Sequence, residues 1–405
     1  MRDLAMTRPQ TGEGIHSMDA WASIPGRLGV LQLLPNMAPN GLARAAVEAA
    51  AAVMAAGGRA VVASAGGPLV PELLRCGAVH ELASFSGDGA FGRWASIRRL
   101  MRILHEHQIA IVHIREPGAA ALARKAASMF GAWLVATCHG THDDSTPAMQ
   151  ERNAAMAEAD RLIAVSQTLA AYLRTQFPTQ GREPLVIAPG LDLQRFDPSR
   201  VGAERIIQLA QQWSLPDGVP VIMLPGRLTR SYGQRALIEA LARLGSRELH
   251  CVLVAEDSGN PGYRRELTRL AEQHGLTARL SIVDDCRDMP AAYMLADAVV
   301  YARSEGCGFA RAAAEAQAMG RPLVAYDGPV LRDQTGGGRM TWLVPPDDRS
   351  ALAAALADAL ELSAAEREAL APQSIAIARQ RYNRADAAAA TIELYLGLLI
   401  QAEAA

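Results

Sequence analysis

The sequence predicts an α/β protein built from two tandem Rossmann-like, doubly wound domains. Its 405 residues are too many for one ordinary core and fit two domains. From Gly29 onward, short apolar runs alternate with longer helical patterns, which is the rhythm of βαβ units. The apolar runs are continuous, as in parallel strands buried on both faces. We therefore expect a ligand site in a cleft between the two halves, at the carboxyl ends of their strands.

The first series of elements begins with the predicted strand "GVLQLLP", which ends at Pro35. A helix is expected over Gly41–Ala56 and another over Ala119–Phe130. Further strands are predicted at "GGRAVVASAGG", "IAIVHI", "WLVATCHG" and "DRLIAVS". Residues 1–26 mix Pro, Gly, Thr and charges without periodicity and lack the apolar block of a signal peptide, which predicts a disordered leader.

The second series follows "PGLDLQRFDP" and has the same rhythm. Helices are expected over Gly233–Leu244 and Tyr263–His274, and Ala-rich helices from Ser350 onward. The predicted strands are "PVIMLPGRL", "LHCVLVAED", "RLSIVDD", "DAVVYAR", "RPLVAYDG" and "TWLVPPDD". We expect a first domain over 27–200, a second over 201–380, and a C-terminal helix within 381–405 that packs back toward the first domain.

The composition excludes several classes of protein. Half of the residues are hydrophobic, a fifth are charged, and the net charge is −2, so the overall field does not favour nucleic acid as a partner. The five cysteines are scattered and form no Cys-x-x-Cys pair, which argues against a zinc site or a disulfide framework and favours a reducing compartment. No window approaches the ~18 apolar residues of a membrane span.

Several motifs together resemble one family. "LPGRLTRSYGQRALIEAL", "DMPAAYMLADAVVY", "EAQAMGRPLVA" and "WLVPPDD" resemble the nucleotide-binding half of retaining family 4 glycosyltransferases, which have the GT-B fold and belong to glycosyl transferases group 1. "ATCHGTH", "RLIAVSQ" and "PGLDLQRFDP" resemble the family's first half and its domain junction. The resemblance covers about residues 28–400, with the motifs in the family's order.

This resemblance implies a function of the hexosyltransferase type. The second domain would hold a nucleotide-sugar donor, and the sugar would pass, with retention of anomeric configuration, to an envelope glycan or lipid-linked acceptor at the first domain. Neither a metal nor another cofactor is expected. The family's bacterial envelope enzymes also imply a place in the cytoplasm or at the inner face of the plasma membrane.

The donor diphosphate is expected near the motif "PGRLTR". The resemblance implies that Arg227 binds it, since a guanidinium can donate to two phosphate oxygens at once. Gly226 precedes this arginine in the same loop. Tyr232 stands where the family has a lysine, and either Arg230 or Arg235 is a candidate to supply the missing charge.

A pair of acids in the family is only half present. Glu315 matches the second acid, whose carboxylate accepts hydrogen bonds from the ribose hydroxyls. Cys307, eight residues earlier, replaces the first acid, which in the family faces the transferred sugar and belongs to the catalytic set. Glu305 is a candidate substitute. The turn whose N–H groups meet the donor in the family comprises Gly308, Phe309 and Ala310.

The first half contributes a histidine and a loop. His139 of "CHGTH" matches the family histidine that reaches the donor sugar and diphosphate, and His142 is a weaker candidate. The loop after the first strand, glycine-rich in the family, reads Asn40-Gly41. We expect Asn40 to tolerate the left-handed conformation that glycines adopt in such loops.

The two replacements leave an alternative function open. A catalytically silent GT-B protein that binds a nucleotide or a partner enzyme would also lack the lysine and the first acid. Restoring both, by Tyr232→Lys with Cys307→Glu, separates the alternatives. A nucleotide-sugar epimerase ranks third, because the acid region resembles the transferases.

Two weaker patterns remain. "GDGAFG" from Gly87 to Gly92 fits a dinucleotide fingerprint but does not follow the first strand of its domain, so NAD is not favoured. The helix around Arg93–Leu104 alternates apolar residues with arginines. It fits either a peripheral contact with an anionic membrane, near a lipid-linked acceptor, or an ordinary half-buried helix.

Overall fold

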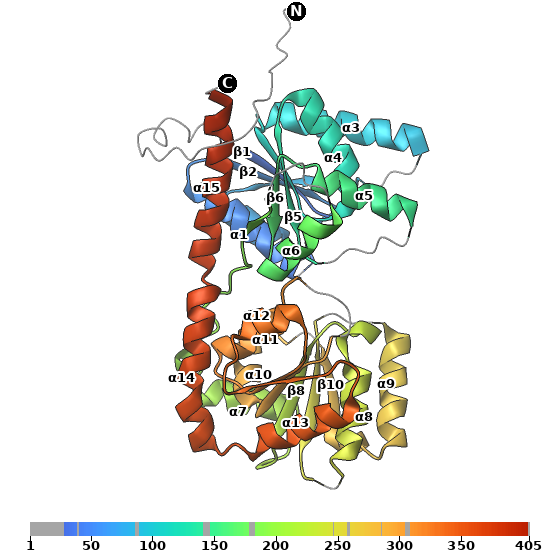
Figure 1. The fold of residues 1–405 in the computed structure, drawn as a ribbon, viewed down its shortest axis with the longest axis vertical. Coiled ribbons are helices and arrows are strands. Elements are labelled where there is room, and N and C mark those ends of the chain that lie inside the picture. The colour runs from blue at the N-terminus through green and yellow to red at the C-terminus, as the bar shows by residue number, and fades with distance from the viewer. Residues whose placement is uncertain are drawn as a thin grey trace, which may run out of the picture. The chain divides into compact units, whose positions relative to one another are not determined.

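The chain folds into two compact units, each built on its own parallel sheet (Figure 1). The computed structural model describes residues 28–38, 40–85, 89–140, 146–177, 183–245, 247–256, 260–284, 286–303 and 308–403. The first unit runs to Gly190 and includes the segment from Ala385, and the second is Leu191–Arg384. This confirms the predicted fold class. The predicted leader, residues 1–26, lies outside the described residues.

The first sheet has seven strands in the order β3-β2-β1-β4-β5-β6-β7, and every neighbouring pair is parallel. Growth of the sheet reverses direction between β1 and β4, which are hydrogen-bonded neighbours. The strands are β1 (Gly29–Leu33), β2 (Arg59–Ser64), β3 (Val79–Leu82), β4 (Ile111–Ile114), β5 (Trp133–Cys138), β6 (Arg161–Ala164) and β7 (Leu185–Val186).

Helices cover both faces of this sheet. In Figure 1, α1 and α15 lie on one side of it, and α3, α4 and α5 on the other. The helices of this unit are α1 (Gly41–Ala55), α2 (Val70–Arg75), α3 (Gly89–Glu106), the 3-10 turn η3 (Pro117–Ala119), α4 (Ala120–Phe130), α5 (Pro147–Ala157), α6 (Gln167–Gln176) and α15 (Arg384–Glu403).

Local sequence explains where these elements begin and end. All five residues of β1 are buried, as its unbroken apolar run predicts. Side-chain oxygens of Asn40, Thr146 and Ser166 accept backbone hydrogen bonds and so begin α1, α5 and α6. The last helical residue of α4 is followed by Gly131, whose left-handed φ of 85° closes the helix.

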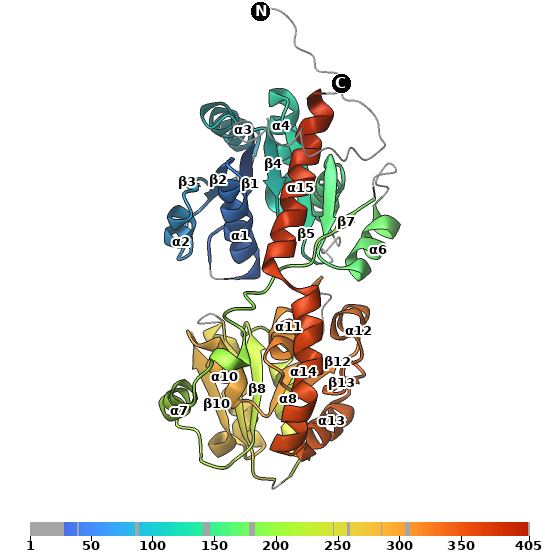
Figure 2. The same cartoon turned by 90° about the vertical axis from the view of Figure 1, so that its left-hand side faces the viewer.

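The final helix belongs to the first unit although it lies at the far end of the sequence. Figure 2 shows α15 running along the first sheet between α1 and α6. Tyr395, Leu396 and Leu398 are part of the same buried core cluster as Val47 and Val53 of α1. The C-terminal segment therefore completes the core of the unit that the first 190 residues begin.

The second sheet has six parallel strands in the order β10-β9-β8-β11-β12-β13. Its growth reverses between β8 and β11, as the first sheet's does between β1 and β4. The strands are β8 (Val221–Gly226), β9 (His250–Ala255), β10 (Leu280–Asp284), β11 (Ala298–Tyr301), β12 (Leu323–Tyr326) and β13 (Thr341–Val344).

Helices again cover both faces. The helix α8 packs between α9 and α13, and α11 packs against α14. The elements of this unit are η4 (Pro198–Arg200), α7 (Ala203–Gln212), η5 (Arg230–Tyr232), α8 (Gln234–Arg243), α9 (Pro261–Gln273), η6 (Thr277–Arg279), α10 (Met289–Leu295), α11 (Arg311–Ala318), α12 (Pro329–Thr335), α13 (Arg349–Glu361) and α14 (Ala364–Arg381).

The border between the units differs from the expected position after residue 200. Leu191 forms a parallel bridge with Asn383 and donates from its backbone nitrogen to Tyr382 O at 2.8 Å. Asp197 forms an ion pair with Arg379 at 3.2 Å. These contacts fasten the segment after Gly190 to the end of α14, so it belongs to the second unit.

Candidate functional site

Two of the predicted residues, Arg227 and Glu315, follow neighbouring strands of the second sheet. Arg227 directly follows β8, and Glu315 lies on α11, which follows the neighbouring strand β11. In doubly wound sheets, ligands bind outside the carboxyl ends of the strands where the strand order reverses. The β8–β11 pair is this reversal point.

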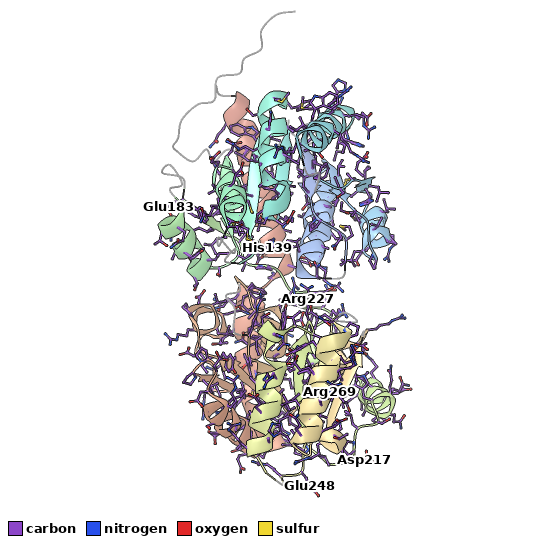
Figure 3. All side chains as sticks on the ribbon, turned by 90° about the vertical axis from the view of Figure 1, so that its right-hand side faces the viewer. His139, Glu183, Asp217, Arg227, Glu248 and Arg269 are labelled. Carbon is purple, nitrogen blue, oxygen red and sulfur yellow. The ribbon has the colours of Figure 1, made fainter. Side chains whose placement is uncertain are left out.

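The side chain of Arg227 is exposed, and the backbone of the loop after β8 that carries it is held by a hydrogen bond. The side chain of Gln234, 0% exposed, donates from Nε2 to Arg227 O at 2.8 Å, which holds the backbone of the loop. Gly226, at φ 150°, leaves room for the ring of Tyr232, because a Cβ there would come within 2.4 Å of its Cδ1. Figure 3 shows Arg227 in the second unit, where it follows the carboxyl end of β8.

The ring of Tyr232 lies beneath a cation that the sequence analysis missed. The guanidinium of Arg303, two residues after β11, lies 5.1 Å from the ring centroid. A cation over an aromatic face is attracted by about 0.5–1 kcal/mol at exposed sites and more when desolvated. The signal was present in the sequence, as an arginine just after a strand, but the link to Tyr232 needs the strand order.

The two arginines expected to replace the family lysine are already engaged. Arg230 donates from both terminal nitrogens to Glu266, at 2.9 and 2.5 Å. Arg235 pairs with Glu239 at 2.9 Å and with the same Glu266 at 3.4 Å. Both arginines therefore have carboxylate partners in this structure, and their role as substitutes for the lysine stays a prediction.

Glu315 is positioned by a buried phenol. Tyr293, 0% exposed, donates from its hydroxyl to Glu315 Oε2 at 2.9 Å, and its ring lies edge-on to Phe196. Burial raises the pKa of Glu315 above its ordinary value, although nearby Arg311 and the hydrogen bond from Tyr293 oppose this. The carboxylate keeps Oε1 as a further acceptor for a hydroxyl ligand.

The turn before α11 only partly fits its predicted role. Gln334 brackets Ala310: its Oε1 accepts from the backbone nitrogen at 2.9 Å, and its Nε2 donates to the carbonyl oxygen at 2.7 Å. The backbone N–H of Ala310 therefore donates to Gln334 within the protein, contrary to the prediction that it donates to the donor substrate. Phe309 packs edge-on against Tyr382, and Gly308 is buried. Cys307 and Glu305 lie outside the described residues.

In the first unit, buried polar side chains gather near the carboxyl ends of β1, β4 and β5. Gln32 of β1 lies opposite His113 of β4, and both are 1% exposed. The ring of His113 is hydrogen-bonded through Nδ1 to Tyr395 Oη at 2.5 Å and through Nε2 to Thr137 Oγ1 at 2.7 Å. The sequence analysis missed this group. Its signal is a polar residue inside each of two apolar runs, Gln32 in "GVLQLLP" and His113 in "IAIVHI".

His139 directly follows β5 and is half-buried (Figure 3). His113 lies on β4, and His139 follows the neighbouring strand β5. Burial, then Arg115, then His139 hold the pKa of His113 well below its ordinary value. His139 thus lies at the carboxyl edge of the first sheet, where it was predicted. His142 lies outside the described residues.

Asn40 has a different role from the one expected. Its φ of −112° is extended, so the left-handed conformation is not used. Its side-chain Oδ1 accepts from Ala43 N at 3.0 Å and caps α1, whose first residue is Gly41. The loop therefore delivers the amino end of α1 to the carboxyl end of β1, a position that favours anions.

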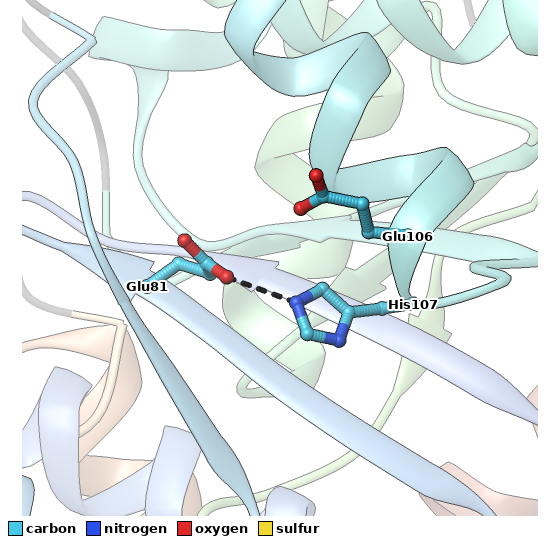
Figure 4. A group of neighbouring side chains, drawn as sticks. All are labelled: Glu81, Glu106 and His107. Carbon is cyan, nitrogen blue, oxygen red and sulfur yellow. Dashed lines mark hydrogen bonds and ion pairs between the residues drawn. The ribbon is translucent and has the colours of Figure 1, made fainter.

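One cluster of side chains has metal-ligand chemistry. Among the residues described, Glu81 of β3 and Glu106 and His107 at the end of α3 place one ligand atom each within 4.8 Å of one another (Figure 4). Two carboxylates and an imidazole suit zinc. However, His107 Nε2 already contacts Glu81 Oε1 at 2.9 Å, and the group includes none of the predicted site residues.

The basic helix α3 is half-buried. Leu100 and Leu104 are buried in the domain, whereas Trp94 is 53% exposed with the Arg98 guanidinium 4.7 Å from its ring centroid. Of the glycine-rich stretch "GDGAFG", the described residues 89–92 form the first turn of α3. No helix in the described parts of the chain combines the length and apolarity needed to cross a membrane.

Comparison with known proteins places this architecture. A model of Glycosyltransferase Family 4 matches residues 39–195, and one of Glycosyl transferases group 1 matches residues 219–362. A D-inositol 3-phosphate glycosyltransferase of Salinispora arenicola is 35% identical over 201 residues, covering 45% of this chain and 44% of that protein. The match thus spans less than half the length of this curated relative.

Solved structures match the fold over nearly the whole chain. A glycosyltransferase from Rickettsia africae superposes with a TM-score of 0.83 at 22% identity, covering 92% of this chain and 99% of that one. The Anabaena protein HepE, solved with UDP and glucose, gives 0.78 at 22% identity, covering 91% and 99%. The two sheets and their strand order define a two-domain protein of the GT-B class. The chain belongs to the family 4, group 1 glycosyltransferases.

Proposed function

We propose that the protein transfers a sugar from a nucleotide-sugar donor to an envelope glycan or lipid-linked acceptor, with retention of anomeric configuration. The observation that carries this proposal is the topology of the second sheet: Arg227 directly follows β8 and Glu315 lies on the helix after β11, and these two strands are the neighbours at the reversal point. A cation for phosphates and an acid for ribose hydroxyls are the two groups that a nucleoside diphosphate requires.

The residues suit a reaction in which the leaving diphosphate must be stabilised. Arg227 can donate to two phosphate oxygens, and Tyr232, with Arg303 over its ring, adds a hydroxyl and a nearby positive charge. Oriented donors of this kind act where negative charge develops. Glu315, held by Tyr293, would fix the nucleoside by accepting from the ribose.

The donor and the place of action are part of the same proposal. The Anabaena neighbour was solved with UDP and UDP-glucose, which makes these the first compounds to try. We propose that the first unit receives the acceptor, that His139 reaches the donor sugar and diphosphate, and that no metal is needed. Action in the cytoplasm or at the inner face of the plasma membrane, with α3 as a peripheral contact, follows from the envelope acceptor.

The test uses the full chain with UDP and UDP-glucose. We expect UDP to raise the melting temperature and bind measurably by calorimetry. Arg227→Ala should lower donor turnover about a hundred- to a thousandfold, or ~3–4 kcal/mol, and Glu315→Ala should weaken UDP binding.

Arg269→Ala is the matched control, because Arg269 is an exposed arginine on α9 of the same unit (Figure 3). This variant should match the wild type in binding and turnover. No binding of uridine, guanosine or adenosine diphosphates, or equal activity of Arg227→Ala and Arg269→Ala, would contradict the proposal.

A further inference from the structure

A buried arginine stands at the reversal point of the first sheet. Arg115 directly follows β4, the neighbour of β1, and only 6% of it is exposed. This is the position in the first unit that corresponds to the ligand-binding point of a doubly wound sheet. The second sheet has Arg227 in the equivalent region, but there the arginine is exposed.

The hydrogen-bond partner of Arg115 is the neutral side chain of Gln32. Its Nε donates to Gln32 Oε1 at 2.8 Å, and Gln32 Nε2 donates in turn to Ala46 O of α1 at 2.8 Å. The bond to Ala46 fixes which end of the amide faces the guanidinium. Within the described chain, no carboxylate lies at ion-pair distance from Arg115, and its two terminal nitrogens have no protein acceptor.

Two of the groups near Arg115 carry no charge. His113 stays neutral because its pKa is held well below the ordinary value, and burial raises the pKa of Tyr395 to about 12, so this phenol is neutral too. Burial lowers the pKa of Arg115, while Tyr395 and Glu48 act in the opposite direction. A guanidinium remains protonated even so.

Burial of a cation with no carboxylate at ion-pair distance is costly, and the cost is relieved when an anion binds to it. The two terminal nitrogens of Arg115 can donate side by side to a phosphate or a carboxylate. His139, which follows the next strand β5, adds a further donor at the same edge. The amino end of α1, behind Asn40, favours negative charge there as well.

We propose that Arg115 binds an anionic group of the acceptor, a phosphate or a carboxylate, so that the acceptor is a charged compound and not a neutral sugar. This inference rests on the proposed glycosyl transfer. It gives the first unit its own anion site, separate from the diphosphate site at Arg227.

The experiment titrates the full chain with inorganic phosphate, and with acetate as a carboxylate probe, in calorimeter runs with and without saturating UDP. We expect one of the two anions to bind in both conditions. Arg115→Gln should weaken that binding at least tenfold and leave UDP affinity unchanged. Arg124→Gln, an exposed arginine of α4 in the same unit, should change neither.

A second variant keeps the guanidinium. Gln32→Glu places a carboxylate against Arg115, so it should compete with the ligand and also weaken anion binding at least tenfold. Its melting temperature is measured alongside, because the bond to Ala46 is lost. This variant decides the question if Arg115→Gln does not fold.

Three results would overturn the inference. They are wild-type protein that binds neither anion, anion binding that survives both variants, and anion binding that UDP or Arg227→Ala abolishes, since the anion would then occupy the diphosphate site. Failure of the proposed function has a different signature: UDP does not bind, while the effect of Arg115→Gln on phosphate or acetate is still measured.

Discussion

The ligand-binding role that we propose for Glu315 would come at a cost to the stability of the ligand-free protein. Its carboxylate is half-buried beside the buried Tyr293, and burial raises its pKa. An acid whose folded pKa is raised binds its proton more tightly in the folded protein than in the unfolded chain. Its contribution to stability is present below the unfolded pKa and is lost as the pH rises through the folded pKa.

The first prediction concerns Glu315→Gln, which removes the charge and keeps an acceptor for Tyr293. At pH 8 the ligand-free variant should melt above the wild type, and the difference should shrink toward pH 4, where the wild-type acid is protonated. UDP affinity should fall at least tenfold. Glu272→Gln, an exposed acid of α9, is the control. A variant that melts below the wild type at both pH values would refute the account.

At the scale of elements, glycines set how closely helices approach strands. Gly233 begins α8 at φ 83°, and a Cβ there would lie 2.2 Å from Ala302 O, just after β11. Gly131 ends α4 at φ 85°, yet a Cβ there meets nothing within 4 Å. The two share a backbone conformation and differ in surroundings.

The second prediction compares Gly233→Ala with Gly131→Ala in urea unfolding. Gly131→Ala should cost about 1–2 kcal/mol for the left-handed conformation alone. Gly233→Ala should cost about 2–5 kcal/mol, because overpacking adds about 1–3 kcal/mol. It should also weaken UDP binding, since Tyr232 is the adjacent residue. Equal costs for the two variants would show that the contact with Ala302 is relieved cheaply.

At the scale of the whole molecule, α15 returns the end of the chain to the first unit. Tyr395 is 0% exposed and Leu398 1% exposed in the core cluster that includes α1. Full burial of a large apolar side chain contributes about 1.5–3 kcal/mol. Two or three such residues therefore approach the net stability of a small domain, ~5–15 kcal/mol.

The third prediction is that a chain ended after Arg384 loses the structure of the first unit. Hydrogen exchange should rise to that of an unfolded chain in β1, β4 and β5, while the second unit keeps its protection and still binds UDP. Glu393→Ala, at an exposed position of α15, should leave exchange unchanged. Protection of the first sheet in the shortened chain would refute the role given to α15.

Sequence motifs identified some of the candidate site residues, and the structure added others. At the residue scale, Arg227 and Glu315 were named from motifs, whereas Arg303 and Arg115 were not. Arg230 and Arg235 were named as substitutes, but Glu266 of α9 engages both. Asn40 was expected to be left-handed, and it is an extended cap.

The sequence by itself determined the two-sheet α/β class, most helix positions and the family motifs, because burial periodicity, caps and breakers are local properties of the chain. Only the tertiary structure decided which polar groups meet. His113 and Tyr395 are 282 residues apart in the chain, and Gln32 reaches Arg115 from another strand. Such pairs depend on strand order and on the return of α15, which local patterns do not encode.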